Sequence, residues 1–103
     1  MIELSEAKKH LRVLHNHEDD IIQIYIDAAI SRFEQFTGRK LYIDQVALDA
    51  DSQSPAYTQL INSEIKAGCL ILVAHLYVNR DMDADIPKTI SYLWQAYWVP
   101  MIS

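Results

Sequence analysis

Apolar residues recur every three or four positions along the first third of the chain, which is the spacing of one face of an α-helix. Ser5 is a good N-cap residue, and the pattern predicts a short helix over residues 5–13. The apolar stripe of this helix consists of Leu4, Ala7 and Leu11.

A second and longer helix is predicted after a break at residues 14–17. Asn16 offers a cap, the acidic residues 18–20 suit the positive end of the helix dipole, and Gly38 provides a stop. The apolar positions with helical spacing are Ile22, Ile26, Ala29, Phe33 and Phe36.

The apolar face of this second helix is wider than one partner helix requires. The additional positions are Ile21, Ile24, Tyr25 and Ile30. Two interpretations remain open: the helix is the centre of a small bundle, or part of the face contacts another subunit.

The middle of the chain combines a polar stretch with the most apolar segment. Residues 44–54 are expected to form an irregular loop, with a short strand at 46–48 or a minor hairpin from residues 41–43 as the other possibility. Ser54 and Pro55 predict the start of a long helix that includes the almost wholly apolar block CLILVAHLYV.

The acidic sequence DMDAD, residues 81–85, interrupts this pattern, and Pro87 can open a last short helix. The predicted fold is therefore all-α: a small bundle of about four helices, two long and two short. The loop or minor hairpin lies between the second and third helices, and residues 1–103 form a single domain.

Composition agrees with a helical fold and argues against several functions. The chain is 50% hydrophobic and 22% charged, with only two glycines and three prolines, which is too few turn residues for an all-β fold. A net charge of −5 disfavours a protein that grips nucleic acid through lysine and arginine. No apolar stretch is long enough for a membrane span and the N-terminus does not resemble a signal peptide, so we expect a soluble protein.

Residues with catalytic or metal-binding potential do not form a known pattern. The four histidines are His10, His15, His17 and His75. None has zinc-site spacing, and DMDAD lacks the glycine and the distal glutamate of a calcium loop. Cys69 lies in an apolar segment and has no basic neighbour closer than Lys66. We therefore expect neither an enzyme nor a metal or cofactor site.

Large aromatic residues crowd the C-terminal segment, which holds more rings than so small a domain easily buries. They either cap the bundle or contact a partner. Together with the wide face of the second helix, they form the predicted interface set: Ile21, Tyr25, Ile30, Tyr92, Trp94, Tyr97 and Trp98.

Four segments in this order resemble the head–tail connector (adaptor, head-completion) family of long-tailed phages and prophages. They are LSEAKKHLRV, HEDDIIQIYIDAAISRFEQFTGRKL, IKAGCLILVAHLYVNRD and IPKTISYLWQAYW, which together span most of the chain. The most specific feature is the combination of TGR with AHLYxNR. The matching positions are Gly38, Arg39, His75, Tyr77, Asn79 and Arg80.

The resemblance implies a ring of about twelve copies that docks beneath the portal, extends the DNA channel and presents a surface to the next tail-side protein, a stopper or head-completion protein. It implies a virion protein at the head–tail junction that is made in the host bacterial cytoplasm. DNA would pass through without sequence-specific binding. Because a negative wall does not hold DNA, we expect the loop carrying Asp44, Asp49 and Asp51 to face the channel.

Two other classes of protein remain as alternatives to a connector. The first is a small helical oligomeric binding or regulatory protein, such as a dimeric regulator, which a stable dimer at all concentrations would indicate. The second is a metal-dependent or acid–base enzyme that uses His15, His17 and the neighbouring carboxylates, which zinc titration with activity screening would detect.

Overall fold

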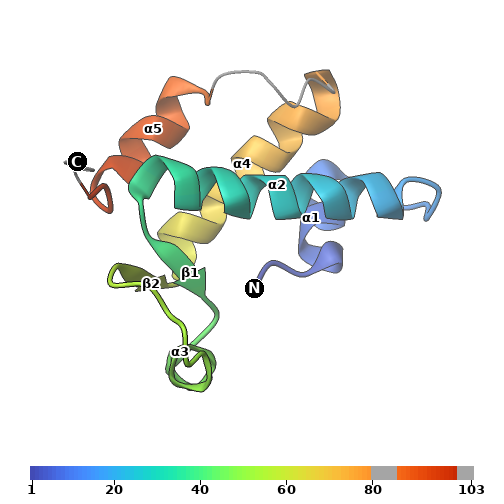
Figure 1. The fold of residues 1–103 in the computed structure, drawn as a ribbon. Coiled ribbons are helices and arrows are strands. Elements are labelled where there is room, and N and C mark those ends of the chain that lie inside the picture. Colours follow the sequence, from blue (N-terminus) through green and yellow to red (C-terminus); the bar gives the residue numbers. More distant parts are fainter. Residues whose placement is uncertain (80–85, 100–103) are drawn as a thin grey trace.

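A computed structural model describes residues 1–79 and 86–99, which form five helices and two short strands (Figure 1). In chain order these elements are α1 (Leu4–Leu11), α2 (Asp19–Thr37), β1 (Lys40–Tyr42), α3 (Gln45–Ala50), β2 (Thr58–Leu60), α4 (Ser63–Asn79) and α5 (Lys88–Gln95). The prediction of a mostly helical chain is confirmed, with one more helix than expected.

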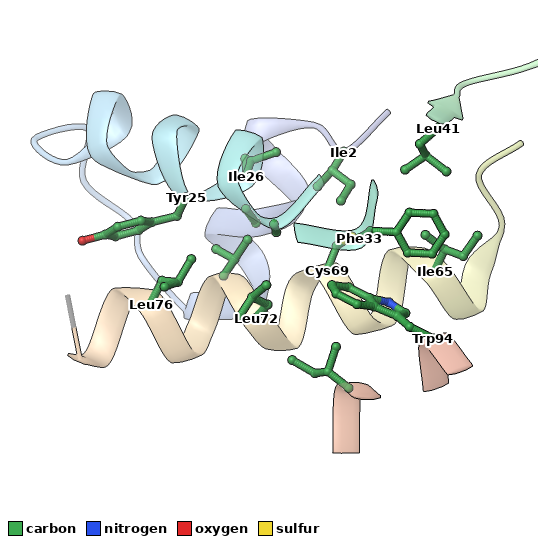
Figure 2. Packing of buried hydrophobic residues seen from close by; sticks show 14 of the residues in the cluster. Ile2, Tyr25, Ile26, Phe33, Leu41, Ile65, Cys69, Leu72, Leu76 and Trp94 are labelled. Carbon is green, nitrogen blue, oxygen red and sulfur yellow. The ribbon is translucent and has the colours of Figure 1, made fainter. Parts of the chain in front are cut away.

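Helices α2 and α4 form the centre of the structure, because each is the other's most extensive contact (Figure 2). The buried side chains of α2 follow the predicted helical spacing and meet those of α4. The buried side chains at this contact are Ile22, Ile26, Ala29 and Phe33 from α2 and Ile65, Cys69, Leu72, Val73 and Leu76 from α4. Burying each large aliphatic or aromatic side chain contributes roughly 1.5–3 kcal/mol, so the contact between α2 and α4 is a main source of stabilisation.

Helix α5 packs on both central helices through its two buried residues, Ile90 and Trp94. Trp94 is fully buried, and its ring meets that of Phe33 edge to face at a centroid distance of 5.4 Å. Gly68 of α4 gives the indole its space: a Cβ built at this glycine would lie 2.5 Å from Trp94 Nε1. The close approach of α5 to α4 therefore requires glycine at position 68.

Helix α1 covers α2 and α4 from another side, and both of its ends are fixed. At its start, the Glu3 and Glu6 side chains form a reciprocal capping box, and Glu6 also pairs with Lys66 of α4 at 3.1 Å. At its end, Arg12 adopts the left-handed conformation with φ 61°. Ala7 is completely buried beneath the helix.

The segment between α2 and α4 differs from the prediction of an irregular loop. Asp44 caps α3 by accepting a hydrogen bond from the Ala47 amide at 2.9 Å, so residues 46–48 are helical instead of extended. β1 pairs with β2 in parallel, Leu41 opposite Gln59, instead of forming a hairpin. A parallel pair needs a crossover connection, which here contains α3.

The long helix also begins later than predicted. Ser54 and Pro55 lie before β2, and α4 starts at Ser63, where the Asn62 side chain accepts the Ile65 amide at 2.8 Å. Two boundaries agree with the prediction: Gly38 ends α2 in the left-handed conformation, with φ 77°, and α5 opens directly after Pro87. The predicted caps Ser5 and Asn16 are wrong, because Glu3 and Glu18 occupy the N-cap positions, and α1 ends at Leu11 instead of residue 13. The DMDAD segment lies outside the described residues.

We expect Gly68→Ala to lower the free energy of unfolding by about 1–3 kcal/mol, because the added methyl group overpacks the indole. Helix propensity alone predicts the opposite sign, since alanine is favoured over glycine inside a helix. Urea unfolding measures the difference. A smaller cost in a Trp94→Phe background, which lacks the pyrrole nitrogen, would identify the contact, and equal costs in both backgrounds would contradict it.

Candidate functional site

The seven predicted interface residues divide into two groups in the structure. Tyr25 and Trp94 are buried in the core, so in the folded subunit they are not available to a partner. Ile21, Ile30 and Tyr97 are half-buried and pack against the core. Only Tyr92 and Trp98 are largely exposed, at 76% and 52%.

The wide apolar face of α2 has a partner on each side within the subunit. Besides α4, the helix contacts α1, α5 and β1. The extra apolar positions are thus explained in large part by a central helix that packs against four neighbours. Ile24, half exposed, is the apolar side chain of this helix that most clearly faces outward.

The turn after α2 is where three parts of the chain meet. Arg39 donates from Nε to the Tyr97 carbonyl at 2.8 Å and from Nη1 to the Thr58 carbonyl at 3.0 Å. The carbonyl of Thr37 accepts the Val99 amide at 2.8 Å. The TGR sequence therefore joins the end of α2 to β2 and to the C-terminal segment.

Thr37 is the buried polar residue at the centre of this turn. Its hydroxyl donates to the Phe33 carbonyl at 2.7 Å and accepts the Arg39 amide at 3.2 Å, so the buried hydroxyl is satisfied both as a donor and as an acceptor by local partners. Thr37 belongs to the TGR sequence, but the sequence pattern assigned it no role of its own, since a threonine before a glycine stop is common.

The other family-matching positions lie at the far end of α4. Tyr77 donates its hydroxyl to Glu18 at 2.9 Å and so ties α4 to the start of α2. The Asn79 side chain donates to the His75 carbonyl at 2.8 Å, one turn earlier in the last part of α4. Arg80 lies outside the described residues.

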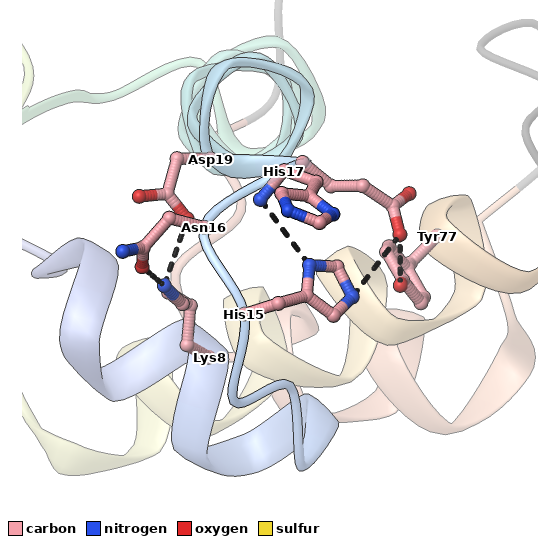
Figure 3. A network of polar contacts seen from close by, with 7 residues as sticks. Lys8, His15, Asn16, His17, Asp19 and Tyr77 are labelled. Atoms are coloured by element: carbon pink, nitrogen blue, oxygen red, sulfur yellow. Dashed lines mark hydrogen bonds and ion pairs between the residues drawn. The ribbon is translucent and has the colours of Figure 1, made fainter.

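The histidine-rich connection between α1 and α2 is a network of local polar contacts (Figure 3). Lys8 contacts Asn16 at 2.6 Å and Asp19 at 2.8 Å, while His15 Nδ1 accepts the His17 amide at 3.2 Å. Among the described residues, no group of three His, Cys, Asp or Glu side chains converges as a metal site would require. Burial raises the pKa of the Cys69 thiol to about 12, so this cysteine is a core side chain.

The three acidic residues expected to face a channel have different surroundings. Asp51 is held inside the lobe, which we define as residues 40–60, by the Tyr42 hydroxyl at 2.6 Å and by Lys40 at 3.2 Å. Asp44 caps α3, and Asp49 accepts the Gln45 side-chain amide at 2.8 Å. Asp44 and Asp49 are exposed, and Asp51 is half-buried.

Hydrogen bonds to the Asp51 carboxylate hold its pKa below the ordinary value of an aspartate. The Tyr42 hydroxyl is the largest cause, followed by the Gln53 amide and Lys40. The same contact with Asp51 raises the pKa of Tyr42.

Large apolar side chains remain exposed on several parts of the surface. They are Leu14, Ile24, Ile43, Val46, Tyr57, Val78, Tyr92 and Trp98. Three of them, Ile43, Val46 and Tyr57, lie in the lobe, and no residue of α3 is buried. Within the part of the chain that the structure describes, no helix is long and apolar enough to cross a membrane.

These features define a small helical protein with a complete core of its own and with apolar side chains left over at its surface. Residues 1–99 match the phage gp6-like head-tail connector protein family, and the chain belongs to this family. It is therefore a structural component of the phage head–tail junction. Searches of curated proteins and of solved structures gave no match.

We expect Arg39→Met to lower the free energy of unfolding by roughly 1.5–3 kcal/mol, because two carbonyls lose a charged donor. Hydrogen exchange should show lost protection at the Val99 amide before any loss in α4. Lys88→Met removes the same charge from an exposed position and serves as the control. Unchanged protection at Val99 would contradict the role of Arg39 in anchoring the C-terminal segment.

We also expect the lobe to loosen in acid. Because the pKa of Asp51 is lowered in the folded protein, its stabilisation is present above the pKa of an unfolded aspartate. The stabilisation is lost as the pH falls through the depressed folded value. A carboxyl NMR titration should show the depressed pKa and its partial return toward the ordinary value in Tyr42→Phe; an identical titration in the variant would refute the assignment.

Proposed function

We propose that this chain is the repeating subunit of a ring that docks under the phage portal, extends the DNA channel and presents the attachment surface for the next tail-side protein. The observation that carries the proposal is the match of residues 1–99 to a head–tail connector family. A ring of about twelve copies is the assembly we infer, with the same contact repeated around an axis until it closes. Its role is structural and not enzymatic.

The distribution of exposed apolar side chains supports self-association. Leu14, Val46, Val78 and Tyr92 are each at least three-quarters exposed and come from four different segments. A subunit in a closed ring needs two different contact surfaces for its neighbours, and further surfaces for proteins above and below.

The acidic charge suits a passage for DNA. With a net charge of −5, the chain does not supply the cluster of lysine and arginine contacts that would hold phosphates and slow the duplex. DNA would pass through the ring without sequence-specific binding. The protein would be made in the host bacterial cytoplasm and become part of the virion during assembly.

The deciding experiment is a deletion of the gene in the source phage. We expect heads and tails to accumulate separately and to join again when a plasmid supplies the chain. Native mass spectrometry of the purified protein, alone and with the portal protein, should show a closed oligomer. Tailed infectious particles in the deletion strain would rule out the connector role.

A further inference from the structure

The lobe lies at one extremity of the molecule (Figure 1). Its exposed side chains include apolar and acidic residues. Ile43, Val46 and Tyr57 are exposed by 51%, 76% and 53%. Residues 43–57 contain three aspartates and no lysine or arginine. Asp51 forms an ion pair with Lys40. The carboxylates of Asp44 and Asp49 have no cationic partner among the described residues.

A groove of complementary character lies at the end of α1. It has a volume of about 520 Å³ and is lined by Ser5, Lys8, Lys9, Arg12, Val13 and Leu14. Leu14 is 97% exposed, which is extreme for a leucine. Lys8 is engaged by Asn16 and Asp19, whereas Lys9 and Arg12 are exposed and form no ion pair within the described part of the chain.

Arg12 occupies a position where glycine would be favoured. With φ 61° and ψ 38°, it terminates α1 in the left-handed region, which is unfavourable for a residue with a Cβ. The helix dipole favours a cation in the last turn, but Lys8 and Lys9 already place positive charge there, so the dipole does not require an arginine at position 12. An arginine at this point places a cation on the rim of the groove at a cost to the fold.

We propose that the lobe of one subunit docks in the α1 groove of the next copy, with Val46 and Ile43 against Leu14 and Val13, and with Asp44 and Asp49 near Arg12 and Lys9. This inference rests on the proposed ring function and names its repeating contact. The two patches differ and lie on different elements, so the contact is heterologous and propagates from copy to copy. In this arrangement Asp44 and Asp49 face the neighbouring subunit instead of the DNA.

Engineered cysteines provide a direct test, because the native Cys69 is fully buried. We expect the double variant Leu14→Cys/Val46→Cys to form a disulfide-linked ladder of oligomers under mild oxidation on a non-reducing gel. Either substitution alone should leave the chain uncrosslinked. The matched control is Thr89→Cys/Val46→Cys, in which an exposed residue of α5 replaces the groove position and no ladder is expected.

Charge exchange tests the polar part of the same contact. Arg12→Glu or Asp49→Lys alone should weaken self-association by about fivefold, and the two together in one chain should restore it. Arg12→Gly separates folding from assembly: it should raise the thermal unfolding midpoint of the monomer while weakening association. Parallel loss of stability and association in Arg12→Gly would overturn the role given to Arg12.

The outcomes distinguish this contact from the ring itself. If the wild-type protein forms closed oligomers but Leu14→Cys/Val46→Cys gives no ladder, the proposed contact is wrong and the ring function stands. Equal ladders with the Thr89 control, or dimers from Val46→Cys alone, also overturn the contact. If the wild-type chain stays monomeric with and without the portal protein, the ring function and this contact both fail.

Discussion

The packing of one indole against one glycine sets the geometry of the helical core. Trp94 lies beside Phe33 (Figure 2), with the two rings perpendicular to each other. Its Nε1 is 2.5 Å from the point where a Cβ at Gly68 would lie. Its indole nitrogen is buried without an acceptor among the described residues, an arrangement that costs roughly 1–3 kcal/mol. The ring is therefore held by its shape and apolar area, and a small residue at position 68 is the condition for α5 to join the bundle.

The TGR turn connects the helical core to β2 and to the segment after α5. Because Arg39 binds the carbonyls of Tyr97 and Thr58, the position of the segment after α5 and the position of β2 are set by the same guanidinium. The Glu34 side chain, one turn earlier in α2, accepts the Leu41 amide at 2.8 Å and occupies the outer edge of β1. Side chains near the end of α2 thus orient the lobe relative to the helices and also protect a strand edge that would otherwise be open to pairing.

The sequence predicted the parts of the fold that depend on local patterns. Helical spacing and the Gly38 stop located α2, and Pro87 located the start of α5, because these signals act within a few residues. The parallel pairing of β1 with β2 was missed, since three-residue strands carry almost no periodicity and the two strands are separated in sequence by α3 and the residues around it. The weak capping signal of Asp44 was present but was masked by the polar composition around it.

Which apolar residues stay exposed also depends on contacts between segments distant in sequence, so the sequence pattern predicted them poorly. Hydrophobicity alone marked Tyr25 and Trp94 as candidates for a partner, yet both are buried in the core. Tyr25 is buried because α2 packs against four elements, and Trp94 because α5 packs on α4 and α2. The residues left for assembly are those that the core does not reach, on connections and on the lobe. Leu14 and Val46 drew no attention from periodicity because each lies in or beside a break in the pattern. In a subunit whose core is complete, such breaks are where apolar side chains are free to contact another copy.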